Sequence, residues 1–155
     1  MKRIFTLVLL ASTLFLWAQE GEYGTAPGKG KILIAFEKTR FKSALVEGLV
    51  EKLEGEGYYL NVVNHQKDGL EGVNPADYDG VFITNSGVTA KVRPVVSEWL
   101  AEKGQPAHVL VHTTQRNDWT PAVEVDSITS ASFKKQDDID RLVEEYAALI
   151  KGQLP

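Results

Sequence analysis

The segment Lys31–Ser43, with the sequence KILIAFEKTRFKS, constrains the fold of this chain more than any other part. Its first half contains the continuous apolar run Ile32–Phe36, which is typical of a strand buried on both faces of a sheet. A short loop and a helix-type pattern follow. In an open α/β sheet, the carboxyl end of the first strand is a common ligand site, often for a phosphate at the N-terminus of the next helix. The loop here contains Lys38, Arg40 and Lys42 and lacks glycine.

Strand-type and helix-type patterns alternate along the rest of the chain. Apolar residues recur at helical spacing in Phe41–Glu54, Ala90–Lys103 and Asp137–Lys151, which predicts three helices. Further strands are predicted over Tyr58–Asn64, Gly80–Thr84, Ala107–His112 and Ala122–Ile128, with Gln66–Asp79 mostly loop. Because strands separated by helical crossovers pair in parallel, we expect a three-layer α/β domain around a five-stranded parallel sheet.

The N-terminus has the pattern of an export signal. Met1–Arg3 is positively charged, and Ile4–Trp17 is apolar, uncharged and too short to span a bilayer comfortably. We therefore predict a signal peptide over residues 1–18, cut after Ala18, and a periplasmic or secreted protein with no membrane span after cleavage. Leu16 is a poor match to the small residue favoured before such a cut, so an uncleaved anchor is the alternative. The absence of cysteine excludes a lipoprotein anchor, disulfides and thiol chemistry.

The mature chain is predicted to be acidic and to form one domain. Residues 19–30 are rich in Gly, Pro and polar residues and are predicted to be a linker, and residues 31–155 the domain. Removal of Lys2 and Arg3 leaves 15 of the 17 basic residues against 21 acidic ones, a net charge of −6. An acidic domain is a poor general binder of nucleic acid, so we expect no nucleic-acid partner. The sequence leaves the oligomeric state open.

From Lys31 to the C-terminus the sequence resembles the flavodoxin-like family. KILIAF matches the first flavodoxin strand, and DYDGVFITNSGVTAKVRPVVSEWLAEKG, over Asp77–Gly104, resembles the third strand, the flavin-contacting loop and the helix after it. The resemblance implies a flavodoxin-like fold with strand order 2-1-3-4-5. It also implies bound FMN and a role in electron transfer with a redox partner protein.

The loop that would hold the FMN phosphate departs from the family pattern. Flavodoxins place Ser and Thr around a Gly here, whereas this chain retains Thr39, has Arg40 in place of the Gly and Lys42 in place of the final Thr. Left-handed backbone at such a Gly would cost Arg about 1 kcal/mol. Lys and Arg near helix amides also bind phosphate. The resemblance thus implies contacts to FMN or another anion from Lys38, Thr39, Arg40, Lys42 and Ser43. The alternative is that the cations are simply solvated.

Two further segments correspond to flavin contacts in the family. The residues after the third strand, Thr84, Asn85, Ser86 and Gly87, resemble the loop beside the isoalloxazine ring; a polar turn that caps the next helix is the alternative. Trp119, after the fourth strand, stands where flavodoxins place a second ring-flanking aromatic residue. A Trp that covers its loop against the core is the alternative.

Residues Val125–Ser132, VDSITSAS, resemble a flavinylation sequence. Its form, Asp-x-x-Ser/Thr-Gly-Ala-Ser/Thr, occurs in exported subunits of sodium-pumping NADH:quinone oxidoreductases, where the last hydroxyl residue carries FMN through a phosphoester bond. By this resemblance Ser132 is a possible covalent acceptor, with Ser130 in place of the Gly. The alternative is a strand that ends in a Ser/Thr turn.

Two functions therefore remain open. The first is an exported, FMN-associated electron-transfer protein, with FMN held non-covalently at the strand ends or covalently at Ser132. The second is a non-redox binding module that holds an anionic ligand or partner through Lys38, Arg40 and Lys42. No catalytic residue is predicted, and whether the chain is an enzyme stays open. His65 and His112 have no partner at metal-ligand spacing, so no metal site is predicted.

Overall fold

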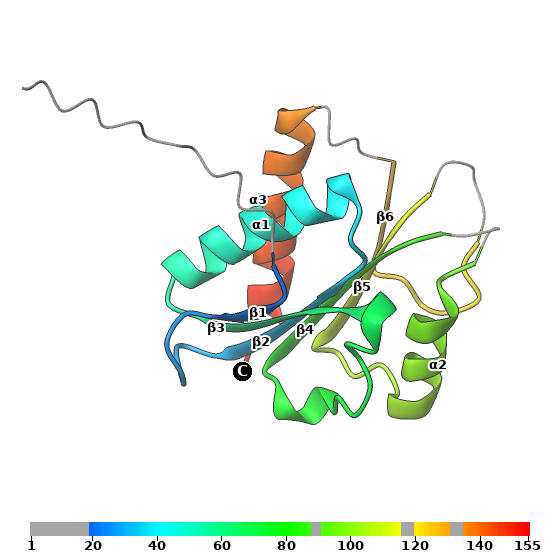
Figure 1. The fold of residues 1–155 in the computed structure, drawn as a ribbon, viewed down its shortest axis with the longest axis horizontal. Helices are drawn as coiled ribbons and strands as arrows, with labels where there is room; N and C mark the ends of the chain where they lie inside the picture. The colour runs from blue at the N-terminus through cyan, green and yellow to red at the C-terminus, as the bar shows by residue number, and fades with distance from the viewer. Residues whose placement is uncertain (1–18, 88–90, 116–119, 131–134) are drawn as a thin grey trace, which may run out of the picture.

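The computed structural model describes residues 19–87, 91–115, 120–130 and 135–155, which are built around a six-stranded sheet in the order β1-β3-β2-β4-β5-β6 (Figure 1). The strands are β1 (Gly21–Tyr23), β2 (Lys31–Phe36), β3 (Tyr59–Asn64), β4 (Gly80–Ser86), β5 (Val109–Thr114) and β6 (Ser127–Thr129). All neighbours pair in parallel except β1 and β3. The five parallel strands thus have the predicted order 2-1-3-4-5, which is confirmed.

Helices cover both faces of the sheet, as a three-layer domain requires (Figure 1). They are α1 (Arg40–Gly55), α2 (Pro94–Lys103) and α3 (Gln136–Gly152), with short 3-10 turns η1 (His65–Lys67) and η2 (Pro75–Asp77). The helices α1 and α3 pack side by side on one face, whereas α2 packs on the other. Among the described residues, none of the helices has the length and apolar composition needed to cross a membrane.

The predicted linker contributes a strand of its own. Gly21–Tyr23 pairs antiparallel with β3, so the sheet has six strands rather than five. An edge strand needs little more than backbone hydrogen bonds along one side, so its Gly-rich, polar sequence gave no strand signal. Tyr23 also packs against the core, which the prediction of a linker with nothing to bury did not foresee.

Two predicted elements are shorter than expected. The second helix begins at Pro94, a residue suited to the first turn, and not at Ala90, which lies outside the described residues. The last strand covers Ser127–Thr129 rather than Ala122–Ile128. The residue before it, Asp126, bonds through its side chain to the backbone of β5, because its Oδ2 accepts from Val111 N at 2.6 Å.

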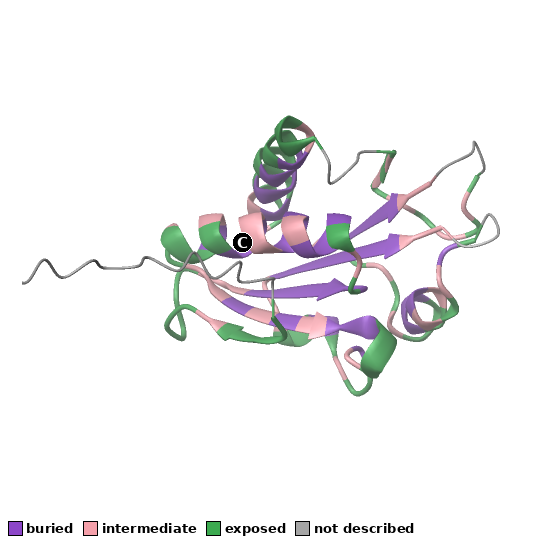
Figure 2. Cartoon of the chain, turned by 45° about the horizontal axis from the view of Figure 1, so that its top comes forward, coloured by how far each residue is buried: buried purple, intermediate pink, exposed green. Residues whose placement is uncertain are grey.

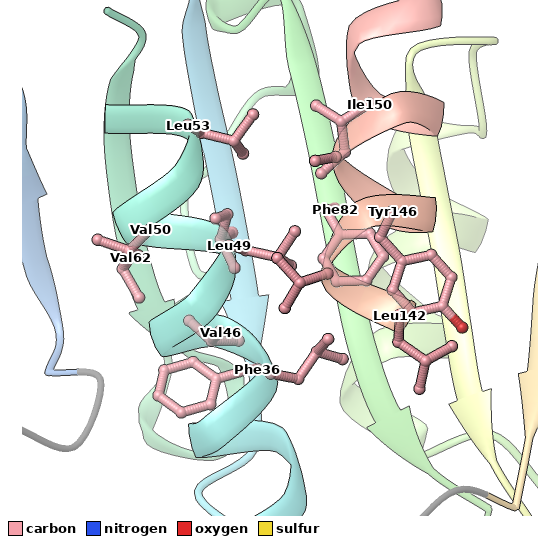
Figure 3. Packing of buried hydrophobic residues seen from close by; sticks show 14 of the residues in the cluster. Phe36, Val46, Leu49, Val50, Leu53, Val62, Phe82, Leu142, Tyr146 and Ile150 are labelled. Carbon is pink, nitrogen blue, oxygen red and sulfur yellow. The ribbon is translucent and has the colours of Figure 1, made fainter. Parts of the chain in front are cut away.

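Alternate residues of the central strands fill two separate apolar cores, and these strands are buried along most of their length (Figure 2). Ile34 of β2 faces α1 and α3, while its neighbour Leu33 faces α2, because successive strand side chains point to opposite faces. On the α1–α3 side, Phe36, Leu49, Phe82 and Tyr146 are among the packed side chains (Figure 3). This two-sided burial explains the continuous apolar runs in the sequence.

Candidate functional site

Buried polar side chains gather at the carboxyl edge of the sheet, where β2, β4 and β5 end. In the described part of the chain the buried polar and charged residues are Glu37, Lys42, Ser43, Asn64, His65, Thr84, Asn85, His112 and Thr113. They lie at the strand ends, in the turn that follows β2, in the first turn of α1 (Arg40–Gly55) or at the start of η1. Because burying polar groups is costly unless they are paired, this edge is the candidate functional site.

A lysine and a carboxylate form an ion pair at the centre of this site. Lys42 Nζ lies 3.0 Å from Glu37 Oε1, and the two side chains are 2% and 0% exposed. Lys42 Nζ also donates to Ser86 Oγ on β4 (2.8 Å) and to Thr114 Oγ1 on β5 (3.0 Å). Arg93 completes the group, because its Nε donates to Glu37 Oε2. We call Glu37, Lys42 and Arg93 the ion-pair group.

Local hydrogen bonds put the members of this group in place. Thr39 caps α1, and its Oγ1 accepts from Lys42 N at 3.3 Å, so the lysine lies in the first turn of the helix. Asn85 is buried on β4 and donates to Thr113 Oγ1 at 2.6 Å. Its Oδ1 accepts from Arg93 N at 3.2 Å. Asn85 therefore fixes the start of α2 against the strand ends, within reach of Glu37.

Burial and charge compete over the ionisation of the pair. Burial opposes the charged form of Glu37 most strongly, but hydrogen bonds from Ser86 and Lys42 and the charges of Lys42 and Arg93 outweigh it. The pKa of Glu37 is therefore lowered. Burial lowers the pKa of Lys42, although the charge of Glu37 opposes that shift.

Two histidines in the same layer are buried in their neutral forms. His112 Nδ1 lies 2.8 Å from Thr84 Oγ1, and its ring packs against Tyr146 and lies parallel to Phe82. Burial, with a smaller effect from the charge of Lys42, lowers the pKa of His112 to about 3. His65 Nε2 lies 3.2 Å from Thr84 O, and burial lowers its pKa as well. Burial therefore favours the neutral form of both imidazoles.

The structure separates the three cations that were predicted to act together. Lys42 is buried in the ion-pair group, where its Nζ pairs with Glu37, and its predicted contact with an anionic ligand stays a prediction. Arg40 lines an outer groove between α1 and α3, beside acidic residues such as Glu47 and Asp140. Lys38 is exposed in the β2–α1 turn. Arg40 and Lys42 lie in the first turn of α1, and successive side chains of a helix point in different directions. The number of charges in a segment does not predict these directions.

The other predicted site residues have mostly structural hydrogen bonds. Thr84 and Asn85 are buried and paired as described above, Ser86 is half-buried, and Gly87 N donates to Thr114 O at 2.8 Å. Ser43 is buried in α1, and its Oγ has no hydrogen-bond partner among the described residues. Trp119 and Ser132 lie outside the described residues, so their roles stay predictions.

Sequence reasoning missed Glu37 and Arg93. Glu37 directly follows an apolar strand, where a lone acid predicts a buried partner, and Arg93 directly precedes Pro94. Both signals are local, whereas the contact joins residues far apart in the sequence. Thr114, which binds Lys42 from β5, was missed for the same reason.

The β2–α1 turn does not fit an FMN phosphate held as in flavodoxins. Arg40 starts a right-handed helix, and among the described non-glycine residues a positive φ occurs at Asp68 and not at Arg40. The backbone N–H of Thr39 already donates to Glu37 O, and that of Ser43 to Thr39 O, both at 2.8 Å. A phosphate would also meet a buried carboxylate at Glu37.

The segment that resembles a flavinylation sequence begins with two residues that the fold itself uses. Asp126 anchors the segment to β5, and Ser127 Oγ lies 2.9 Å from Tyr146 OH on α3. These contacts account for an Asp and a Ser here without a flavin. They hold β6 beside Thr114, so the residues after β6 leave from the carboxyl edge of the sheet.

Solved structures of two flavodiiron proteins and of an oxidoreductase have a similar fold. A mutant flavo di-iron protein from Thermotoga maritima superposes with a TM-score of 0.58 at 18% identity, over 86% of this chain and 37% of that one. A metal-soaked flavodiiron core from Synechocystis gives 0.56 at 5% identity, over 79% and 36%. An oxidoreductase from Corynebacterium diphtheriae gives 0.50 at 11% identity, over 79% and 97%.

These likenesses, together with the strand order, show that the fold is flavodoxin-like. This chain spans little more than a third of the two flavodiiron chains. No protein-family profile matches the sequence, and no curated protein is similar to it. The comparisons therefore show the fold alone, and function has to be argued from the chain's own residues.

Proposed function

We propose that this chain is an exported flavodoxin-like protein that binds a small anionic ligand, with a carboxylate or phosphate group, at the carboxyl edge of the sheet. The observation that carries the proposal is the state of Arg93. Its backbone N and its Nε are both fixed by hydrogen bonds, yet its side chain remains 30% exposed. A guanidinium held in this way is preorganised to bind an anion from solvent.

The charges around Arg93 support the same ligand class. Glu37 balances one of the two cations that pair with it, Lys42 and Arg93, so the ion-pair group keeps an excess of positive charge although the whole chain is acidic. The N-terminus of α1 adds its partial positive charge. The half-buried hydroxyls of Ser86 and Thr114 lie beside Lys42 and add hydrogen-bonding groups. Export is supported by the signal-type pattern of residues 1–18.

Titration with inorganic phosphate, followed by NMR or calorimetry, tests this proposal. Arg93→Gln should weaken phosphate binding at least tenfold, and Lys38→Gln by a smaller factor. Lys29→Gln is the matched control, because Lys29 is an exposed lysine that precedes β2, at the opposite edge of the sheet. Unchanged affinity in Arg93→Gln, or no phosphate binding by the native protein at millimolar concentrations, would contradict the proposal.

Flavin-associated electron transfer with a redox partner protein is the second candidate. It is favoured by the fold class and by the flavinylation-like residues Val125–Ser132. FMN esterified to Ser132 would have its phosphate held by the covalent bond, so this mode does not require a phosphate loop. Native, exported protein that is yellow and keeps its flavin after denaturation would support it, and Ser132→Ala should remove the flavin. A colourless protein of unmodified mass would reject it.

A further inference from the structure

The side chain of Lys42 limits which ligands can bind at the strand ends. Its backbone lies in the first turn of α1, above the end of β2, while its Nζ reaches Ser86 on β4 and Thr114 on β5. Ser86 and Thr114 are direct partners in the β4–β5 register. One side chain therefore crosses the ends of three adjacent strands and occupies the area over which a ligand in this fold class would lie.

Glu37 supplies the negative charge in this area. Its buried carboxylate has Lys42 on one oxygen and Arg93 on the other, and the hydroxyl of Ser86 binds Lys42 beside it. These are the types of donor, cationic side chains and a hydroxyl, that bind a phosphate in a protein. We propose that Glu37 acts as an internal anion in place of a ligand phosphate, and that the ion-pair group closes the strand-end site to non-covalent FMN.

The backbone of the turn leads to the same conclusion independently. The amides of Thr39, Lys42 and Ser43 donate to Glu37 O, Thr39 Oγ1 and Thr39 O respectively. These amides are consequently not available to an incoming phosphate unless the first turn of α1 is rebuilt. A phosphate dianion would in addition have to displace Glu37 from both cations and leave a buried carboxylate without partners, which is strongly unfavourable.

Restoring an uncharged site tests the inference. In Glu37→Gln/Lys42→Thr, the carboxylate becomes an amide. Thr then occupies the last loop position, as it does in flavodoxin-like sequences. We expect this double variant to bind FMN at least tenfold more tightly than the native protein does, as measured by quenching of flavin fluorescence. The native protein should bind FMN no more tightly than inorganic phosphate. Riboflavin, which lacks the phosphate, should gain less than FMN in the double variant.

The matched control removes a similar ion pair from another place. Glu56 and Lys151 form a pair at 2.8 Å between the end of α1 and α3, partly exposed to solvent. Glu56→Gln/Lys151→Thr should leave FMN binding at the native level. If Glu37→Gln/Lys42→Thr does not fold, Glu37→Gln alone replaces it, because this variant removes the internal anion and leaves Lys42 and Arg93 for the phosphate.

Two results would overturn the inference. The first is native protein that binds FMN as tightly as the double variant, which would show that the ion-pair group does not exclude the cofactor. The second is a folded double variant, or folded Glu37→Gln, with no gain over the native protein. Neither result depends on Arg93→Gln, so the inference and the proposed anion site can fail separately.

Discussion

The middle of β2, β4 and β5 and their carboxyl ends are equally buried but chemically opposite. In the middle, side chains such as Ile34 and Phe82 pack against α1 and α3 and need no specific partner. At the ends, Glu37, Thr84 and His112 are just as inaccessible, and each has a hydrogen-bond or ion-pair partner from a different element. The comparison teaches that polarity at a buried strand end does not by itself indicate an open site, because the partners can come from the chain.

The largest effect is expected in the middle of the sheet. Phe82→Ala removes a ring that packs against His112 and Tyr146, with centroids at 6.4 and 5.1 Å. Loss of apolar contacts together with the remaining cavity should lower the free energy of unfolding by about 3–5 kcal/mol. Urea denaturation measures this change. A loss below about 1 kcal/mol would mean that the middle is not the close-packed region that the comparison assumes.

A somewhat smaller loss is expected when the ion pair at the strand ends is broken from one side. Glu37→Gln leaves Lys42 and Arg93 facing each other without a carboxylate and should cost about 3 kcal/mol. Glu37→Gln/Lys42→Met also removes the buried ammonium and should recover part of that loss. Urea denaturation of these two variants and of Lys42→Met gives the coupling between the two residues. Additive losses would show that the two side chains do not interact, and would contradict the view that buried polar residues at the strand ends depend on specific partners.

The difference between the two regions also explains what the sequence could predict. Apolar runs such as Ile32–Phe36 and the helical spacing in α1 depend on residues close together in the chain, so the parallel strands, their order and the three layers followed from patterns and from the family resemblance. The contacts of Lys42 are with Glu37, Ser86 and Thr114. Two of these partners come from other strands, and a sequence pattern does not encode which direction a first-turn side chain takes.

The two edges of the sheet were the least predictable parts. The strand β1 has three residues, two of them exposed, and it is held by its pairing with β3. At the other edge, the predicted strand Ala122–Ile128 is longer than the observed β6. The residue before β6, Asp126, bonds to Val111 both through its backbone N and through its Oδ2. Edge strands are defined by backbone partners, which leave little trace in hydropathy.

Acid should weaken the carboxyl end more than the apolar middle. His112 is held neutral, with a pKa of about 3, whereas in the unfolded chain its pKa is 6.5. As the pH falls below 6.5 the unfolded state takes up a proton that the folded state does not, so stability present above pH 6.5 is lost toward pH 3. Between pH 6.5 and 4.5 this loss should be about 2 kcal/mol.

The comparison variant for this pH effect is His112→Gln, which keeps a polar side chain beside Thr84. Urea denaturation at several pH values should show a shallower decline for His112→Gln than for the native protein. His65 has a lowered pKa too and remains in both proteins, so it contributes the same slope to each. The pKa of Glu37 lies below 4.5, so its contribution is lost mainly under more acidic conditions. Equal slopes in the two proteins would assign the acid sensitivity to other groups.

The smallest change in the free energy of unfolding is expected at Tyr146, which has an apolar ring and a polar hydroxyl in different surroundings. The ring of Tyr146 packs in the apolar middle against Phe82, while its hydroxyl lies 2.9 Å from Ser127 Oγ on β6. Tyr146→Phe keeps the ring and should cost about 1 kcal/mol, the usual contribution of one hydrogen bond. Ser127→Ala breaks the same bond, so the double variant should lose little more than either single variant. A loss of several kcal/mol in Tyr146→Phe would mean that the polar bond, rather than the packing of the ring, fastens α3 to the sheet.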